Sequence, residues 1–286
     1  MSDSLLNEHQ NLHNAHGGGG WLMEKVLKAK DNSHREAYAQ MDTEQASKEF
    51  LKALQIISIE TGNTTVEVFW RFIDWAFWMT IAETRQLAEK LGIPSVVPYS
   101  IDECKTKWEL AREFLVGKDC AKLFGAMSKI WTTRGLSKED FLLDGVTRYG
   151  KNMDALMVKE LKQFFTPSSV GKLMAEMTNM NEQDEDVIVQ YEPCVGFGGL
   201  ILQSWFAYDG LEKPLGSRVY VCEELAFRTM KACYLQLTVN MVPAQVKNMN
   251  SLSRERFHPP FYTGMWLMAL VQNPKACAEM MKYMKN

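Results

Sequence analysis

The sequence has no hydrophobic run long enough to cross a bilayer. A spanning helix needs about 20 nearly uncharged residues, and the most apolar run, Val66–Ile81, is interrupted by Glu67, Arg71 and Asp74. We also expect no secretory leader, because the first twenty residues are polar and end in Gly17–Gly20. We therefore expect a soluble, cytoplasmic protein in which the aromatic run is a buried helix, with no membrane partner.

The sequence also has no closely spaced cysteine pairs and only a small net charge. Its residues suggest no metal site. The six cysteines show no Cys-x-x-Cys spacing, which is typical of reduced thiols rather than of a disulfide framework. A net charge of −3 excludes a global field that attracts nucleic acid, so DNA contact needs a local basic surface or a partner subunit. His9, His13 and His16 lie in a Gly- and Asn-rich tail, which we interpret as solvated and not as a metal site.

The stretch from residue 21 to about residue 160 is helical in pattern, and residues 1–20 have the composition of a disordered lead-in. Apolar side chains recur at three- and four-residue spacing, which indicates one-sided helices. Gly92 and Pro94 end the long aromatic helix in the usual order. The predicted helices of this region cover residues 43–60, 65–92, 100–116, 119–133, 137–149 and 153–162.

After Pro167 the pattern changes to alternating helices and strands. The predicted order is helix 168–180, strand 187–191, helix 198–209, strand 218–222, helix 224–240, strand 245–247 and a helix at 276–285. Such alternation predicts an α/β fold with a parallel, doubly wound sheet. The predicted organisation is therefore a lead-in at 1–20, a helical domain at 21–160 and an α/β domain at 161–286.

The first strand ends in a Gly-rich turn, Glu192-Pro-Cys-Val-Gly196-Phe-Gly198-Gly199. Ligands of open parallel sheets bind beyond the carboxyl ends of the strands, and glycines let the backbone approach them closely. Taken alone, the turn fits a structural role as well as a binding role. A phosphate or dinucleotide loop is the weaker interpretation, because no Gly-x-Gly-x-x-Gly is formed. Glu223 closes the second strand. In nucleoside-binding sheets of this kind, a carboxylate at that position accepts hydrogen bonds from the ribose hydroxyls, and Glu224 is the alternative candidate for this carboxylate.

Three stretches carry a resemblance to a known family: Gln163-Phe-Phe-Thr-Pro167, the Gly-rich turn, and the run 234–252 with Tyr-Leu-Gln-Leu, Val-Pro-Ala-Gln-Val and Asn-Ser-Leu. Together they resemble the adenine-specific (N-6) DNA methyltransferases allied to type I restriction-modification modification subunits, in particular short phage or prophage members. The resemblance covers about residues 140–252. It implies a Rossmann-like S-adenosylmethionine-dependent methyltransferase sheet behind a helical amino-terminal region.

The cofactor-binding residues that the resemblance implies are Phe165, Thr166, Pro167, Glu192, Gly196, Gly198, Glu223 and Asn250. The first three would flank the methionine end of the cofactor, and the next three would surround its amino-acid part. Glu223 would hold the ribose, and Asn250 would lie near the adenine ring. Glu192 stands where the family has Asp, which keeps the charge and lengthens the reach. Thr166 and Pro167 also suit a helix start, and the two interpretations are compatible.

Two segments compete for the catalytic loop, which in that family reads Asn/Asp-Pro-Pro-Tyr/Phe. The first candidate is His258, Pro259, Pro260 and Phe261. It has His where an amide or acid would accept from the exocyclic amine of a flipped adenine. The second, Asn273, has the amide and follows the apolar run Met265–Val271, but lacks the second proline and the aromatic ring. The plainer interpretations, a Pro-rich loop and a helix break, are favoured for both.

The sequence after Asn250 is short for the rest of a methyltransferase sheet, since each strand–helix unit takes roughly 25–30 residues. We therefore expect a truncated sheet without a target-recognition domain. One function is an active adenine-specific DNA methyltransferase that uses S-adenosylmethionine, with a partner or second copy completing the site. The other is a catalytically inactive methyltransferase-like binding module that partners or interferes with host restriction-modification proteins. The protein would bind DNA directly or through a partner subunit. A second copy of the chain would form a homo-oligomer.

Overall fold

The computed structural model describes residues 43–113, 166–179 and 187–284 of the chain. The first of these ranges is all helical: α4 (Thr43–Thr61), α5 (Thr65–Lys90), the 3-10 turn η1 (Pro94–Val96) and α6 (Ile101–Glu113). The predicted helices at 43–60 and 65–92 are thereby confirmed, and the predicted helix at 100–116 is confirmed as far as Glu113, where the described range ends. The predicted helices at 119–133, 137–149 and 153–162, and the domain boundary at 160, lie outside the described residues.

Helix α5 is the longest described element, and both of its ends are set by local chemistry. The Thr64 side chain accepts from the Glu67 N–H at 3.2 Å, while the Glu67 carboxylate accepts from the Thr64 N–H at 2.8 Å, which forms a capping box. The helix stops before Gly92, whose φ of +75° suits a residue without a Cβ. Fourteen of its residues are buried, so the aromatic run is a core helix as predicted.

The remaining described elements form an α/β unit. They are α10 (Ser168–Asn179), β1 (Ile188–Glu192), α11 (Gly199–Ala207), β2 (Arg218–Glu224), α12 (Phe227–Val239), β3 (Ala244–Asn248), β4 (Phe261–Tyr262), α13 (Gly264–Gln272) and α14 (Pro274–Met284). The sheet has the order β1-β2-β3-β4, in which the first three strands are parallel and β4 is antiparallel to β3. The predicted α/β class and parallel pairing are confirmed.

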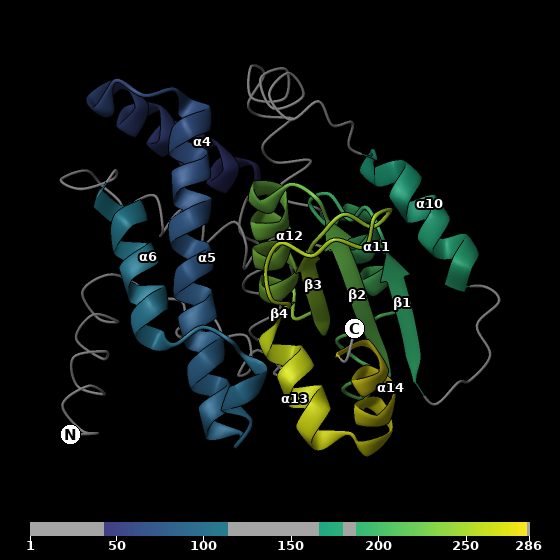
Figure 1. Ribbon diagram of the computed structural model, residues 1–286. Helices are drawn as coiled ribbons and strands as arrows, with labels where there is room; N and C mark the ends of the chain where they lie inside the picture. Colours follow the sequence, from purple (N-terminus) through teal and green to yellow (C-terminus); the bar gives the residue numbers. More distant parts are fainter. Residues whose placement is uncertain (1–42, 114–165, 180–186, 285–286) are drawn as a thin grey trace.

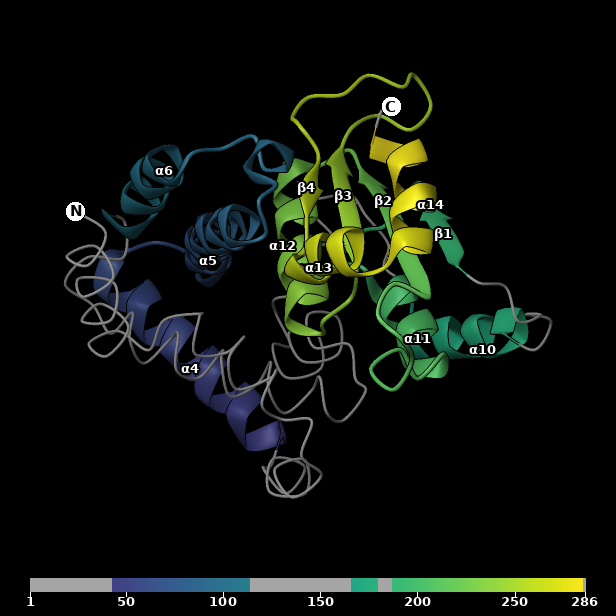
Figure 2. The same cartoon turned by 90° about the horizontal axis from the view of Figure 1, so that it is seen from below.

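Helices cover both faces of the sheet (Figures 1 and 2). On one face Ser204 of α11 bonds to Gln190 of β1, and α12 packs on β2 and β3. On the other face Gln245 of β3 donates to the Tyr283 carbonyl of α14. This layering buries β2 and β3 completely, as expected for parallel strands with helices on both sides.

The helical region packs on the outer side of α12, next to β4 (Figure 1). Phe77 of α5 meets Tyr234 of α12 edge to face at 5.3 Å and Phe261 of β4 at 5.1 Å. Thr84 of α5 also hydrogen-bonds the Tyr234 hydroxyl at 2.9 Å. These contacts join the two parts into one continuous core.

An ion pair crosses the same junction. The ammonium of Lys231 on α12 binds the carboxylate of Asp74 on α5. Its side chain is 7% exposed, and burial lowers the pKa of Lys231 despite the attraction of Asp74. Asp74 therefore compensates the buried positive charge of Lys231, which would be unfavourable without a partner.

Three features differ from the sequence prediction. Strand β2 runs two residues further than predicted, to Glu224, so Glu223 lies inside the strand. The apolar run Met265–Val271, for which no element was predicted, lies in helix α13, and Thr263 caps that helix by accepting from the Trp266 N–H. Strand β4 was not predicted, since two residues carry no periodicity. Within the described ranges, no helix is long and apolar enough to span a membrane, and no group of three His, Cys, Asp or Glu could hold a metal ion.

Asp74→Ala should destabilise the protein by about 3 kcal/mol, because it leaves the Lys231 ammonium buried without a partner. The measurement is the free energy of unfolding in urea. Glu89→Ala is the control, since it removes the exposed ion pair with Arg85 on the same helix and should cost under about 0.5 kcal/mol. Equal losses in the two variants would show that the buried pair does not tie α5 to α12.

Candidate functional site

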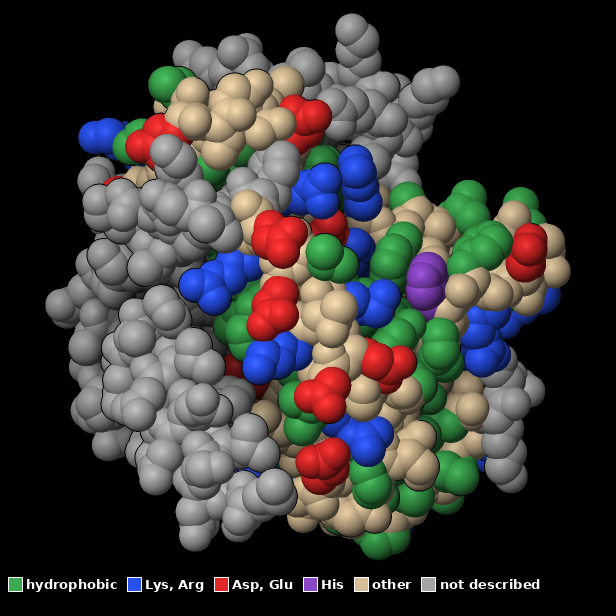
Figure 3. Space-filling view, turned by 60° about the vertical axis from the view of Figure 1, so that its left-hand side comes forward, with side chains coloured by type: hydrophobic (Ala, Val, Ile, Leu, Met, Phe, Trp, Pro, Cys, Tyr) green, Lys and Arg blue, Asp and Glu red, His purple; other side chains and the backbone are tan. Residues whose placement is uncertain are grey.

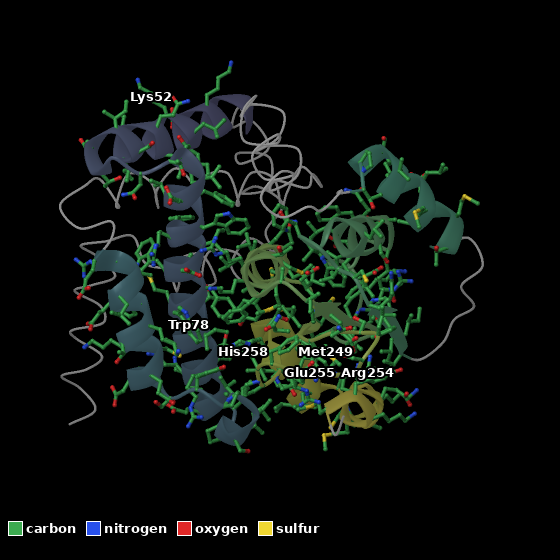
Figure 4. The ribbon with its side chains drawn as sticks, turned by 45° about the horizontal axis from the view of Figure 1, so that its top comes forward. Lys52, Trp78, Met249, Arg254, Glu255 and His258 are labelled. Carbon is green, nitrogen blue, oxygen red and sulfur yellow. The ribbon has the colours of Figure 1, made fainter. Side chains whose placement is uncertain are left out.

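The carboxyl ends of β1, β2 and β3 lie at one edge of the sheet (Figure 1), and a connection leaves each of them. These connections are the Gly-rich turn 193–198, the short link 225–226 and the β3–β4 loop, residues 249–260. This edge is where open parallel sheets bind ligands. In Figure 4 His258 lies toward α5 and Trp78, whereas Arg254 lies on the other side of the loop.

Glu224 joins the three connections. Its carboxylate accepts from the N–H of Gly196 at 3.1 Å and from the N–H of Ala226 at 2.8 Å. Its carbonyl accepts from the Asn248 side chain at 3.0 Å and from the Met249 N–H at 3.1 Å. Because both carboxylate oxygens hold backbone amides, Glu224 is a structural acid.

Glu223 faces the opposite side of the sheet and is completely buried. Its Oε2 accepts from the Tyr191 hydroxyl at 2.7 Å and from Arg254 Nη1 at 2.9 Å. Its Oε1 has no hydrogen-bond partner. A buried carboxylate oxygen without a partner is costly, so this atom marks a place where a ligand donor would be favourable.

The Gly-rich turn has two residues in left-handed conformation, Gly196 with φ +57° and Gly198 with φ +91°. The Glu192 side chain accepts from the Cys194 N–H at 3.1 Å and so closes the start of the turn. A Cβ on Gly198 would lie 3.1 Å from Cys233 Sγ on α12, so this glycine also permits close packing of α11 on α12. The structural interpretation of the turn therefore applies to Gly198, alongside any binding role.

The β3–β4 loop folds back over the Gly-rich turn. The Ser251 hydroxyl donates to the Pro193 carbonyl, and Arg254, with φ +62°, reaches across to Tyr191 and Glu223. The Asn250 side-chain oxygen accepts from the N–H groups of Leu252 and Ser253, at 3.0 and 3.2 Å, and shapes the loop. The contact between the loop and the Gly-rich turn is thus made by Ser251, the neighbour of Asn250.

His258 and Phe261, at the two ends of the first catalytic candidate, have different surroundings. The His258 ring stacks on Phe227 at 4.0 Å between centroids, and its Nδ1 lies 2.8 Å from Asn248 Oδ1. Phe261 is 2% exposed and stacks on Tyr99 of the helical region. Pro259 and Pro260 link the loop to β4. The His258 ring thus lies at the edge of the sheet, whereas the Phe261 ring is a core side chain and cannot stack on a base in this conformation.

Asn273 lies away from this edge. Its side chain donates to the Leu215 carbonyl at 2.9 Å and accepts from the N–H groups of Lys275 and Ala276. Leu215 precedes the first residue of β2, so Asn273 is at the amino end of the strands and caps α14. The predicted helix break is what the structure shows, and the side chain does not approach the Gly-rich turn.

The upstream motif is described only in part. Phe165 lies outside the described residues, and Thr166 and Pro167 are exposed. The Pro167 carbonyl accepts from the N–H groups of Val170 and Gly171 and opens α10, so the predicted helix start is confirmed. Helix α10 begins at the same end of the molecule as the carboxyl ends of the strands (Figure 1).

The surface near this edge carries mixed charge. Viewed from the side of α4, α5 and α6, Lys and Arg side chains alternate with Asp and Glu over the described part of the surface (Figure 3). Burial, followed by the ammonium groups of Lys107 and Lys231, lowers the pKa of His258 below its ordinary value. His258 is therefore mainly neutral at pH 7. In the described part of this face, basic and acidic side chains are interspersed and form no broad basic area (Figure 3).

Four residues of the site were not found by sequence reasoning: Tyr191, Phe227, Asn248 and Arg254. Tyr191 and Arg254 act through contacts with Glu223 that span 32 and 31 residues of sequence. Asn248 ends β3, and that position was the one available signal, because polar residues at carboxyl ends of parallel strands face ligands.

Comparison with known proteins supports the family resemblance. Residues 152–279 match the family model described as N-6 DNA Methylase. A crystal structure of the type I restriction-modification system methyltransferase subunit from Streptococcus thermophilus is similar at 15% identity, with a TM-score of 0.31. The alignment covers 85% of this chain and 59% of that subunit, so the chain spans less than two thirds of its length. No curated protein matches the sequence.

Gly198→Ala should destabilise the fold by about 2–3 kcal/mol, because the new methyl group adds a clash with Cys233 to the strain of a positive φ. Gly92→Ala is the matched control, with φ +75° and nothing within 4 Å of the new Cβ, and should cost about 1 kcal/mol. Urea unfolding compares the two variants. A loss at Gly198 no larger than at Gly92 would mean that α11 and α12 are not in close contact there.

Proposed function

We propose that this chain, which matches the N-6 DNA methylase family over residues 152–279, binds S-adenosylmethionine at the carboxyl edge of the sheet and methylates the exocyclic amine of adenine in DNA. The observation that carries the proposal is the buried Glu223 Oε1 atom, which has no partner at the end of the central strand β2. A phage or prophage origin and a cytoplasmic location belong to the same proposal.

The residues present fit the cofactor at the ribose position. Tyr191 and Arg254 hold Glu223 Oε2, which fixes the carboxylate and leaves Oε1 as a free acceptor. A ribose diol supplies hydroxyl donors, which this atom lacks. Glu224 does not offer the same, since both of its carboxylate oxygens hold backbone amides. Of the two acids considered from the sequence, the geometry therefore favours Glu223.

The other contacts follow the Gly-rich turn. Gly196 and Gly198 let the turn pass close to a ligand, with Glu192 beside its start. Asn250 of the β3–β4 loop is proposed to meet the adenine ring, since the next residue, Ser251, bonds to the turn at Pro193. Phe165, Thr166 and Pro167 are proposed at the methionine end. When bound, the cofactor supplies an activated methyl group, and the role of the chain is to orient it toward the target amine.

On the target side, His258 is the candidate that the geometry retains. It lies on the β3–β4 loop at the edge of the sheet, whereas Asn273 caps α14 at the opposite end of the strands. Pro259 and Pro260 stiffen the approach to β4 by fixing their own φ angles. DNA is proposed to reach this edge directly or through a partner subunit, and the mixed surface charge favours help from a partner or a second copy.

A second function is favoured by one observation. The Phe261 ring is buried against Tyr99 and Phe77, so the first catalytic candidate has no aromatic ring to stack on a base. The chain would then be a catalytically inactive methyltransferase-like module that holds the cofactor and partners or interferes with restriction-modification proteins.

Glu223→Gln should weaken S-adenosylmethionine binding at least tenfold, because the free oxygen and the charge that accept from the ribose are lost, at about 1.5–3 kcal/mol for a charged hydrogen bond. Isothermal titration with the full chain measures it. Glu255→Gln is the control, an exposed acid on the same β3–β4 loop, and should bind normally. Unchanged affinity in Glu223→Gln, or no binding by the unmodified protein, would refute the cofactor site.

The two functions are then separated by transfer of a tritiated methyl group from the cofactor to unmethylated DNA. Incorporation into adenine establishes the methyltransferase. Binding without incorporation, in the presence and absence of restriction-modification subunits, establishes the binding module.

A further inference from the structure

Two neighbours hold the His258 ring in one orientation. Its face lies on Phe227 with an interplanar angle of 9°, and its Nδ1 edge points to the Asn248 side-chain oxygen at 2.8 Å. Asn248 is the last residue of β3 and is 2% exposed. The ring is only half-buried, so part of it faces the surface at the edge of the sheet.

The orientation of the Asn248 amide is set by its other contacts. Its Nδ2 donates to the carbonyl of Glu224 at 3.0 Å and to the carbonyl of Leu225 at 2.8 Å. Rotating the amide by half a turn would place its oxygen against these two carbonyl oxygens, and neither of them can donate a hydrogen bond. The Asn248 oxygen therefore faces His258, and this oxygen can only accept.

This contact decides which His258 nitrogen carries the proton. Because the Asn248 oxygen is an acceptor, His258 Nδ1 must donate and must be protonated. In a neutral imidazole the other nitrogen, Nε2, then carries a lone pair and no hydrogen. None of the described residues hydrogen-bonds to Nε2. The geometry thus leaves one free acceptor at the edge of the sheet.

The charged groups around the ring favour its neutral form. Lys107 of α6 and Lys231 of α12 oppose a second positive charge, and burial acts in the same direction, so the pKa of His258 is below its ordinary value. The Lys231 ammonium is itself bound by Asp74 of α5. At pH 7 the lone pair on Nε2 is therefore available.

We propose that Asn248 is a positioning residue that holds His258 in the Nδ1-protonated tautomer, so that His258 Nε2 accepts a hydrogen bond from the exocyclic amine of an unstacked adenine. The inference rests on the proposed function, because it takes adenine in DNA as the target. In this arrangement the His258 side chain accepts a hydrogen bond from the adenine amine. A ligand without an amine or another donor at that position gains nothing from this atom.

The first test reads the tautomer directly and needs no ligand. A long-range ¹H–¹⁵N spectrum of the full-length ¹⁵N-labelled protein distinguishes the two imidazole nitrogens, and His258→Gln identifies the His258 signals among the five histidines. The expected spectrum shows Nδ1 protonated and Nε2 bare. Asn248→Ala, which removes the acceptor for Nδ1, should give a mixture of tautomers. Asn250→Ala is the control, because Asn250 does not contact the ring.

The second test uses the cofactor-free protein and two single-stranded oligonucleotides, one of deoxyadenosine and one of purine deoxyriboside, which lacks the amine. The deoxyadenosine strand should shift the His258 Nε2 signal, and the purine strand should not. The shift should disappear in Asn248→Ala and as the pH falls through the pKa of His258, because protonated Nε2 can no longer accept.

The results separate the inference from the function on which it rests. A protonated Nε2 in the unmodified protein, a tautomer unchanged in Asn248→Ala, or the same shift or no shift with both strands overturns the inference, whatever calorimetry shows for S-adenosylmethionine. The expected tautomer and an amine-dependent shift, with no binding of S-adenosylmethionine, leave the inference standing and refute the cofactor site.

Discussion

The edge of the sheet depends on one carboxylate, that of Glu224. This carboxylate accepts from the Gly196 N–H of the turn after β1 and from the Ala226 N–H before α12, while the backbone carbonyl of Glu224 accepts from the side chain of Asn248, the last residue of β3. Three connections that are far apart in sequence are thus fixed to one residue. Glu223 can present a free oxygen, and Asn248 can orient His258, only because this neighbouring acid keeps the backbone in place.

The parallel core of the fold was predictable from the sequence, because the compact apolar segments 187–189 and 219–222, at β1 and β2, lie between predicted helices, and the short β3 continues the same alternation. Two features were not. The apolar run in α13 has no charged residue to mark a helical face, so periodicity cannot distinguish it from a buried strand. Strand β4 has two residues and exists only because the chain returns beside β3.

The site was predictable to the level of its loops. Glycines after β1 and acids at the end of β2 have recognisable positions, and both lie at the edge. The choice between Glu223 and Glu224 was not decidable, because a shift of one residue moves a side chain to the other face of a sheet. Arg254 gave no local signal either, since its role comes from a contact across 31 residues of sequence.

The packing of α5 on α12 has a consequence for how the chain is made. Asp74 and Lys231 are 157 residues apart, and at 5–20 residues per second a ribosome needs roughly 10–30 s to make the intervening chain. During that time the aromatic face of α5 lacks its permanent partner and exposes large apolar side chains. Such surfaces are prone to aggregation and are ligands for chaperones. We therefore expect the yield during expression to depend on the time between synthesis of α5 and synthesis of α12, rather than on the stability of the folded protein.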